Sequence, residues 1–473
     1  MEEEFKDELF LIKQRIKRIE SEFEKFRNRA SIAEQKVNFK KITADATANK
    51  ERIMNDINRL VKEYFSINDY KFVPGQTKIP LQAPTYGSDE VIEALDSLLS
   101  TWVTMGKKVQ TFEEEFAKYL GAKYAVMVHS GSSANLLALS VLSNDTLNKR
   151  IMPGDEIITP ATTWATTVTP IADIGAVPVL VDVDLDTFNI NIDAIRDAIT
   201  EKTKAIMLVH LLGNPANIKE IMEITQENDL FVIEDTCESY GAEVDGKKVG
   251  TFGDLATFSF FFSHIITTIE GGMLVTNNEE YSELAKSLRV FGWARNLKNY
   301  EEYARKYPHI DKRFLFVNKG FNFRPTEIQG AFGIHQIKKL DKFIEIRREN
   351  AKYWGKRFSE FSDYLIVQEE RPGTRHVWFG YPLTVRQGSP FTREELVKHL
   401  EESKIETRPI QIPNIAKQPS INFLRHRIHG DLKNAQYIMD NSFWFGNHQA
   451  IGKEEREYIA DKITEFIESK VRR

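Results

Sequence analysis

The sequence holds a single cysteine, Cys237, among its 473 residues. One thiol cannot close a disulfide within the chain and cannot supply the four thiolates that an iron–sulfur cluster needs. The sequence also lacks an apolar run of membrane-spanning length, and its acidic start, MEEEFKDELF, lacks the basic and then apolar order of a secretory signal. These absences predict a soluble, cytoplasmic protein with no iron–sulfur cluster and no membrane contact.

An excess of positive charge is absent as well. The formal net charge of -5 gives no sign of a nucleic-acid partner, so local basic groups would have to meet any anionic substrate. With 41% hydrophobic residues, a chain of this length is predicted to form a large two-domain enzyme with a substantial core. No metal site is predicted.

Residues 1–67 are predicted to form a helical extension. Apolar residues recur there at a 4-3-4-3 spacing with charged residues between them, an a/d heptad pattern over roughly five heptads. These positions, called the heptad seam below, are Phe5, Leu9, Ile12, Ile16, Ile19, Phe23, Phe26, Ala30, Ala33 and Val37. The pattern fails between Asn38 and Lys50 and resumes at Ile53, which predicts two helices. The first is expected to be a coiled coil or a helix docked on another subunit; the alternative is an amphipathic helix that rests on its own domain.

The rest of the chain has the pattern of an α/β protein. Residues 68–87 hold prolines and glycines and are predicted to be an extended linker arm. Over residues 88–330, strand-like runs such as PVLVDVD (178–184) and LFVIEDT (230–236) alternate with helical stretches. That alternation predicts a mostly parallel sheet with its ligand at the carboxyl ends of the strands. Residues 331–473 begin with a long helical run and are predicted to form a smaller α+β domain.

The segment TFSFFFSHIITTIEGGML (257–274) contains His264 between Ser259 and a closing glycine pair. This stretch resembles the cofactor loop of the DegT/DnrJ/EryC1/StrS family of nucleotide-sugar aminotransferases, usually written SFxxxKxxTTGEGG. The lysine of that loop holds pyridoxal phosphate as a Schiff base in the family, and here histidine stands at the lysine position. Imidazole is not a primary amine, so it cannot form that bond, but it can move a proton near neutral pH.

Two further segments match family motifs at strand ends. In HSGSSANLLAL (129–139), the helix-start amides, Gly131 and the hydroxyls of Ser132 and Ser133 are predicted to cradle the phosphate of the cofactor. The alternative for this segment is ordinary helix capping. In TPATTWATT (159–167), the resemblance places Trp164 against the pyridine ring, whereas the alternative is plain packing.

The segment VIEDTCESYGA (232–242) places Asp235 at the end of a predicted strand. A carboxylate there can pair with the pyridine nitrogen and keep it protonated, which makes the ring an electron sink. The resemblance puts Glu238 near the 3-hydroxyl group of the cofactor, where the family's aminotransferases usually carry glutamine and its dehydratases glutamate. Ser259 is also expected to bind the cofactor. The alternative for the acidic pair is a helix N-terminus.

The segment GFNFRPTEIQGAFGIHQIKKL (320–340) is similar to the family's GxNxRxxEIQAAxGxxQL. In the family's dimers this loop crosses to the neighbouring active site, so Asn322 is expected to contact the phosphate there. Arg324 is expected to contact the substrate or the subunit interface; the alternative is a buried Arg324 paired with Glu327. The resemblance spans about residues 85 to 473. It implies the aspartate aminotransferase fold (fold type I), an α/β architecture with a mixed, mostly parallel seven-stranded sheet and a smaller C-terminal domain, in a homodimer.

The histidine in place of lysine is typical of one branch of the family, the sugar 3-dehydratases, which bind pyridoxamine phosphate non-covalently. The resemblance therefore implies removal of the C3 oxygen from a nucleotide-linked 4-keto-6-deoxyhexose, with His264 as the base, in the synthesis of 3,6-dideoxysugars for surface polysaccharide. The nucleotide stays open between GDP and CDP, and glutamate is the expected amino donor. The alternatives are a pyridoxal-phosphate-dependent aminotransferase and a catalytically silent cofactor-binding scaffold. The N-terminal helices are expected to add a higher oligomer.

Overall fold

A computed structural model of the chain describes residues 2–67, 70–368 and 370–471. Its contacts divide the chain into two compact units, Met1–Asn68 and Asp69–Arg473. None of the helices in the described ranges combines the length and the apolar character that a bilayer span requires.

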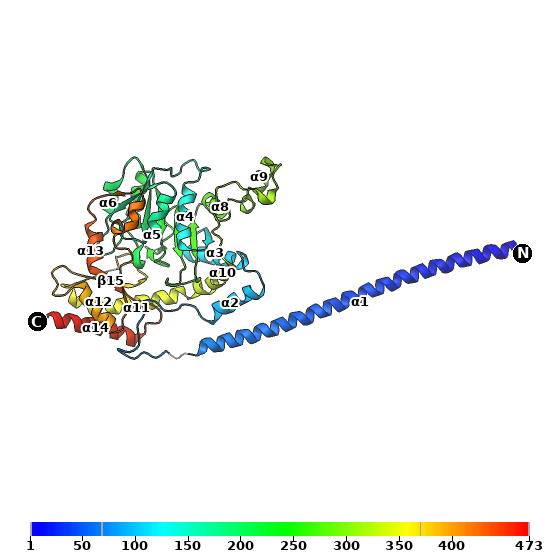
Figure 1. The fold of residues 1–473 in the computed structure, drawn as a ribbon, viewed down its shortest axis with the longest axis horizontal. Coiled ribbons are helices and arrows are strands. Elements are labelled where there is room, and N and C mark those ends of the chain that lie inside the picture. The colour runs from blue at the N-terminus through cyan, green and yellow to red at the C-terminus, as the bar shows by residue number, and fades with distance from the viewer. Residues whose placement is uncertain (1, 68–69, 369, 472–473) are drawn as a thin grey trace. The chain divides into compact units, whose positions relative to one another are not determined.

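The first unit is one helix, α1 (Glu2–Ser66), drawn without interruption in Figure 1. The predicted break between Asn38 and Lys50 is therefore wrong. No proline or glycine occurs before Pro74, and Ala46 and Ala48 in the polar stretch are strong helix formers, so the backbone continues although the apolar pattern lapses. The described seam side chains, Ile19, Phe23 and Phe26, are exposed by 64%, 71% and 71%. The seam side chains of Phe5, Leu9, Ile12, Ile16, Ala30, Ala33 and Val37 lie outside what the structure describes.

The second unit is built on a mixed sheet with the strand order β1-β9-β8-β5-β4-β2-β3-β14. The two pairs that involve β9 are antiparallel, and the other neighbours are parallel. The strands are β1 (Tyr124–Val128), β2 (Glu156–Pro160), β3 (Val177–Val181), β4 (Thr203–Val209), β5 (Phe231–Asp235), β8 (Leu255–Ser259), β9 (Gly272–Thr276) and β14 (Arg427–Ile428). The predicted mixed, mostly parallel sheet is confirmed, with one strand more than expected. The extra strand, β14, has two residues, which is too short for any periodic signal.

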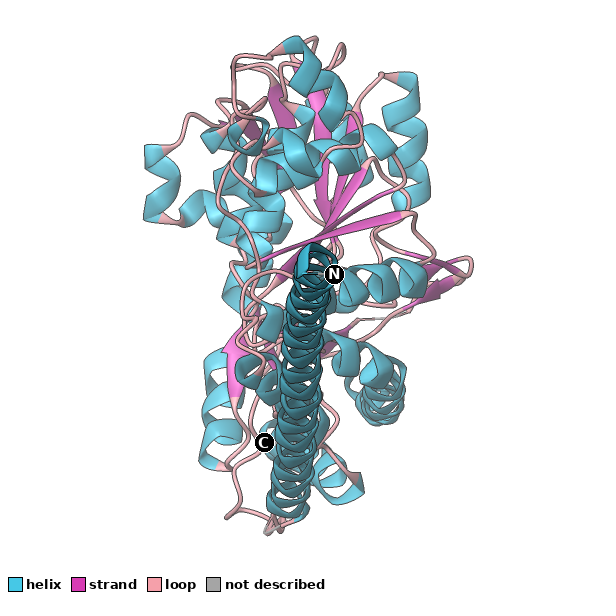
Figure 2. Ribbon diagram, turned by 90° about the vertical axis from the view of Figure 1, so that its right-hand side faces the viewer, coloured by secondary structure: helices cyan, strands magenta, loops and turns pink. Residues whose placement is uncertain are grey.

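Helices cover both faces of this sheet (Figure 2). Alternate residues of each strand pack on opposite faces, as Val232 and Ile233 of β5 do in two separate apolar clusters. Strands buried on both faces explain the nearly continuous apolar runs that the sequence shows. The helices up to the end of the sheet region are α2 (Ser88–Leu99), α3 (Lys107–Leu120), α4 (Gly131–Leu142), α5 (Ala165–Asp173), α6 (Ile192–Ala198), α7 (Ile218–Glu227), α8 (Glu279–Arg289), α9 (Tyr300–Lys306) and α10 (Glu327–Gln336).

A second, antiparallel sheet with the order β10-β12-β15-β13 lies in the C-terminal part. It comprises β10 (Leu365–Val367), β12 (Tyr381–Val385), β15 (Ser442–Phe445) and β13 (Thr407–Pro409). A separate apolar cluster packs there around Trp354 and Tyr381. Phe72 and Ile79, from the segment between α1 and α2, belong to the same cluster. The accompanying helices are α11 (Leu340–Phe358), α12 (Arg393–Glu402), α13 (Lys433–Asn441) and α14 (Lys453–Val471).

Smaller elements complete the unit. A three-stranded sheet has the order β11-β6-β7, formed by β11 (Thr374–Arg375), β6 (Glu243–Val244) and β7 (Lys247–Lys248). Short 3₁₀ segments are η1 (Leu211–Gly213), η2 (Ala294–Asn296), η3 (Lys312–Phe314), η4 (Ile337–Lys339), η5 (Ser359–Phe361), η6 (Ile415–Lys417) and η7 (Pro419–Phe423).

Candidate cofactor site

The predicted site residues meet at one edge of the main sheet. Strands β5 and β8 are parallel. Strand β1 runs in the same direction as β8, because β1 and β8 each pair antiparallel with β9. The carboxyl ends of all three strands therefore lie at one edge. Asp235 ends β5, Ser259 ends β8, and Gly131 begins the helix that follows β1. This edge is where open α/β sheets bind their ligands.

Asp235 is held in place by two helices. Its Oδ2 accepts hydrogen bonds from Nδ2 of Asn135 on α4 at 3.1 Å and from Oγ1 of Thr167 on α5 at 2.8 Å. Its Oδ1 accepts one from the backbone amide of Cys237 at 3.2 Å. The carboxylate is buried, with 4% of the residue exposed. A buried carboxylate needs such partners, and this one is fixed in a single orientation at the strand end.

The start of α4 packs directly against the end of β8. A Cβ on Gly131 would overlap Cβ of Ser259 and would lie 2.7 Å from its Oγ, so only glycine permits this approach. Ser130 is the N-cap, and its hydroxyl accepts a hydrogen bond from the amide of Ser133 at 3.2 Å. Capping therefore accounts for Ser130 and for the amide of Ser133, while Ser132 is exposed. The amides of Gly131 and Ser132 have no acceptor within the helix, which is the arrangement that binds a phosphate.

Glu238 is a buried carboxyl with two donors. Its Oε2 accepts from the amide of Leu212 at 2.7 Å, and its Oε1 accepts from Nε2 of Gln411 at 2.5 Å. Burial, with a smaller contribution from the charge of Asp235, raises the pKa of Glu238 to about 7. Glu238 can therefore gain or lose a proton near neutral pH.

His264 lies in the loop that joins β8 to β9, at the same sheet edge. Its ring is half-buried, 6.2 Å from the Tyr240 ring and 5.6 Å from the Phe379 ring between centroids. Burial and, to a lesser extent, the charge of Arg347 lower the pKa of His264 to about 3, so the imidazole is neutral at neutral pH. Its Nδ1 is buried and has no hydrogen-bond partner among the described residues. A neutral imidazole with a free nitrogen is able to accept a proton.

Trp164 caps the start of α5 with 54% of its surface exposed, so core packing does not explain this tryptophan. Arg324 donates from Nε to Oδ1 of the exposed Asn322 at 3.0 Å, and its guanidinium lies 4.8 Å from the centre of the Phe291 ring. The alternative of an Arg324–Glu327 pair is wrong. Glu327 instead accepts hydrogen bonds from backbone amides at the start of α3, those of Gly106 at 2.7 Å, Lys108 at 2.7 Å and Val109 at 3.4 Å.

No separate prediction named Asn135, Gln411 or Arg347. Asn135 stands inside the glycine–serine motif, where its spacing from Gly131 puts it on the buried side of α4. Gln411 and Arg347 come from the C-terminal part, and no sequence pattern connects them to the cofactor loop. His210, at the end of β4, is satisfied locally: its Nε2 lies 3.1 Å from Oε2 of Glu234, and its Nδ1 accepts from the amide of Ala216 at 2.9 Å.

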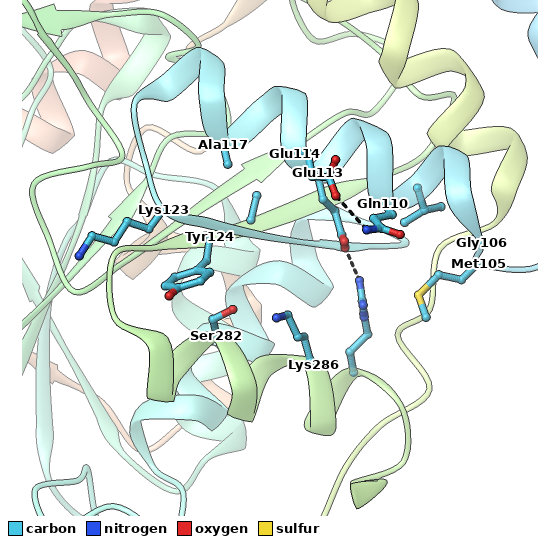
Figure 3. A pocket seen from close by; sticks show the side chains of 13 residues that line it. Met105, Gly106, Gln110, Glu113, Glu114, Ala117, Lys123, Tyr124, Ser282 and Lys286 are labelled. Carbon is cyan, nitrogen blue, oxygen red and sulfur yellow. Dashed lines mark hydrogen bonds and ion pairs between the residues drawn. The ribbon is translucent and has the colours of Figure 1, made fainter. Parts of the chain in front are cut away.

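A cavity of about 420 Å³ lies elsewhere, between α3, β1 and α8. Glu113 of α3 reaches across it to Nη1 of Arg289 on α8 at 2.5 Å (Figure 3). None of the predicted site residues lines this cavity. Within the described ranges, no group of three or more His, Cys, Asp and Glu side chains is arranged to hold a metal ion.

The residues at the sheet edge fit pyridoxamine phosphate or pyridoxal phosphate. A fixed carboxylate suits a protonated pyridine nitrogen, and free amides at a helix start suit a phosphate. The neutral imidazole of His264 suits a base that takes a proton from a bound ligand. The donor set thus matches the two ends of the cofactor, and His264 at the same sheet edge adds one base.

Comparisons with known proteins agree with this chemistry. The model of the DegT/DnrJ/EryC1/StrS aminotransferase family matches residues 84–464. The chain is 42% identical over 373 residues to GDP-4-keto-6-deoxy-D-mannose 3-dehydratase of Yersinia pseudotuberculosis, covering 78% of this chain and 94% of the relative.

Solved structures are similar over the same region. The Escherichia coli GDP-4-keto-6-deoxy-D-mannose 3-dehydratase with bound hydrated pyridoxal phosphate superposes with a TM-score of 0.77 at 40% identity, over 81% of this chain and 98% of the other. A GDP-4-keto-6-deoxymannose 3-dehydratase with a trapped pyridoxal phosphate–glutamate geminal diamine gives a TM-score of 0.75 at 39% identity, over 81% and 99%. The predicted aspartate aminotransferase fold is confirmed by these likenesses, and the chain belongs to the DegT/DnrJ/EryC1/StrS aminotransferase family.

Proposed function

We propose that this chain is a pyridoxamine-phosphate-dependent 3-dehydratase of a nucleotide-linked 4-keto-6-deoxyhexose, in the synthesis of 3,6-dideoxysugars. The observation that carries the proposal is His264, which replaces the lysine of the family loop and keeps a neutral ring. A lysine would hold the cofactor covalently, whereas histidine leaves it non-covalent and adds a base at the same place.

The cofactor, when bound, supplies a primary amine that condenses with the 4-keto group and a ring that takes up electrons. Asp235 is assigned to the pyridine nitrogen, because Asn135 and Thr167 fix its carboxylate there. The amides of Gly131 and Ser132 are assigned to the phosphate. His264 is assigned to accept the proton that must leave the cofactor's amine-bearing carbon before the C3 hydroxyl can depart.

Glu238, Ser259 and Trp164 are assigned supporting roles around the cofactor. Because its pKa is near 7, Glu238 can donate a hydrogen bond as an acid or accept one as a carboxylate, which suits a phenolic 3-hydroxyl group. Ser259 lies against Gly131 beside the phosphate amides. Trp164, at the start of α5, has an exposed ring that is free to stack on the pyridine.

GDP is the proposed nucleotide, since relatives that match over nearly their whole length act on GDP-linked sugars by name. Glutamate is the proposed amino donor, and the solved relative with a pyridoxal phosphate–glutamate adduct supports it. The catalytic assembly is proposed to be a homodimer with shared active sites. Asn322 and Arg324, joined to each other on the surface, would then reach the phosphate and substrate of the neighbouring subunit.

The test compares wild type with His264→Lys in the presence of pyridoxamine phosphate, glutamate and GDP-4-keto-6-deoxymannose or its CDP-glucose counterpart. Mass spectrometry follows the sugar. Loss of the C3 oxygen by wild type and its absence with His264→Lys are expected, and the substrate that reacts identifies the nucleotide. Transfer of an amine to C4 by wild type would establish an aminotransferase instead, and cofactor binding without turnover of either sugar would establish a silent scaffold.

A further inference from the structure

We propose that α1 is a self-association element that pairs with α1 of a second copy of this chain, parallel and in register, as a coiled coil. This inference does not depend on the proposed catalytic activity. The family model matches residues 84–464, so α1 lies outside the region that this model matches.

Among the described residues of its own unit, the apolar face of α1 has no partner. With 65 residues, α1 extends for roughly 98 Å at 1.5 Å per residue, and it is the one element of the first unit's described residues. Ile19, Phe23 and Phe26, in the middle of the heptad seam, are exposed by 64%, 71% and 71%. Large apolar side chains repeated along one stripe of a long helix mark an interaction surface.

The charges beside the seam identify the partner. With Ile19 and Phe26 at d and Phe23 at a, positions e and g flank the seam. In a parallel, in-register pair, each g residue faces the e residue five positions later in the other helix. The four such pairs from Glu8 to Glu34 have opposite charges: Glu8 with Lys13, Arg15 with Glu20, Glu22 with Arg27, and Arg29 with Glu34. The next pair, Lys36 with Lys41, is like-charged and marks the end of the complementary stretch.

The same charges argue against a register shifted by one heptad. A shift of one heptad sets Arg15 against Arg27 and Glu20 against Glu22, so every attractive pair becomes repulsive. Arg15, Glu20, Glu22 and Arg27 are exposed, and the contact seen for Glu22 is with Arg18 of its own helix at 3.6 Å. Because one chain supplies both members of each pair, a second copy is the complementary partner.

Disulfide trapping in the full-length protein tests the geometry. Ile19→Cys, and independently Phe26→Cys, place a thiol at a d position, where two parallel chains bring identical residues together. Ser21→Cys is the matched control, because Ser21 is at position f and faces away from the seam. All three variant chains keep the native Cys237. Fast oxidation to a crosslinked dimer at both d positions, but not at Ser21, is expected. Crosslinking that is equal at all three positions, or absent at both d positions, would overturn the proposal.

Charge exchange tests the partner. Two double variants are made in the Ile19→Cys chain. The first, Glu20→Lys with Glu22→Lys, makes both g–e pairs within residues 15–27 positive on each side and therefore repulsive. The second, Arg15→Glu with Arg27→Glu, makes the same pairs negative on each side and equally repulsive. Each double variant alone should crosslink no more than the Ser21→Cys control. An equimolar mixture, with one chain tagged by size, should restore crosslinking between unlike chains, since those pairs become opposite again. Crosslinking that persists in either variant alone, or fails to return in the mixture, would contradict the assignment.

Discussion

Asn135 and Asp235 are 100 positions apart in sequence, yet Nδ2 of Asn135 donates to Oδ2 of Asp235 at 3.1 Å inside the protein. Nδ2 of Asn135 also donates to the carbonyl oxygen of Thr166 at 2.9 Å, and Oδ1 of Asn135 accepts from Oγ1 of Thr257 at 2.5 Å. Asn135 thus connects α4, β5 and β8. It orients the carboxylate that is proposed to face the pyridine nitrogen.

Asn135→Ala is expected to weaken binding of pyridoxamine phosphate by about tenfold, which corresponds to about 1.4 kcal/mol. The loss follows because the Asp235 carboxylate would lose one of its two side-chain donors, a bond of about 1.5–3 kcal/mol. Cofactor affinity is measured by absorbance titration. Thr167→Ser is the matched control, since it keeps a hydroxyl at the second donor position. An affinity equal to that of wild type would remove Asn135 from its positioning role.

Gly131→Ala is expected to lower the unfolding free energy by about 1–3 kcal/mol and to abolish cofactor binding. The added Cβ would overlap Cβ of Ser259, so α4 must move away from β8 and its amides from the phosphate position. Thermal unfolding and absorbance titration measure the two effects.

The rescue variant for Gly131→Ala combines it with Ser259→Gly, which removes the clashing atoms. Partial recovery of stability is expected from this double variant. Gly87→Ala is the control, because a Cβ at Gly87 meets nothing within 4 Å. If the Gly131→Ala protein binds cofactor as tightly as the Gly87→Ala protein, close packing at Gly131 is not what forms the cradle.

The sequence was sufficient for the sheet and for the order of the site motifs, because buried strands and glycine turns leave local patterns. Asp235 and Gly131 stand in such patterns, and the structure places both at the expected sheet edge. The residues that hold them depend on long-range contacts. Gln411 reaches Glu238 across 173 positions, and no local pattern encodes that approach. The break predicted in α1 was wrong because a local pattern was interpreted too far: the apolar spacing indicates which side chains pack, not whether the helical backbone continues.

Glu238→Gln is expected to flatten the pH dependence of stability between pH 4.5 and about 7. The folded-state pKa of Glu238 is raised to about 7 from an ordinary value of 4.5, so the folded protein binds more protons in this window. The unfolding free energy of wild type should therefore fall as pH rises through the window, by at most about 1.4 kcal/mol per pH unit for one proton. Glutamine cannot titrate, so the variant should lose that slope.

Urea unfolding of the cofactor-free protein at pH 5 and pH 7 measures the slope at Glu238. Glu227→Gln, at an exposed glutamate on α7, serves as the control for the loss of one charge. Parallel pH profiles for wild type and Glu238→Gln would show that this carboxyl titrates at its ordinary value.

Arg347→Met is expected to raise the pKa of His264 while leaving it below 6.5. Arg347 is fully buried, and its Nη1 donates to the carbonyl oxygen of Phe379 at 2.8 Å, whose ring lies 5.6 Å from that of His264. The guanidinium charge opposes protonation of the imidazole, so its removal stabilises the imidazolium form. Burial of His264, the larger cause of its lowered pKa, remains in the variant.

The pKa of His264 can be followed by NMR of ring-labelled histidine, and in turnover as the acid limb of kcat/KM. Both should move to higher pH with Arg347→Met. Arg347→Lys keeps the positive charge and should leave both near their wild-type positions, which separates charge from packing. Because the folded-state pKa is depressed, His264 contributes stability that is present above pH 6.5 and lost as pH falls toward 3. Arg347→Met should raise the lower limit of the pH range over which this stability is lost, because the folded-state pKa of His264 rises. If neither substitution changed the pKa of His264, burial alone would keep the imidazole neutral.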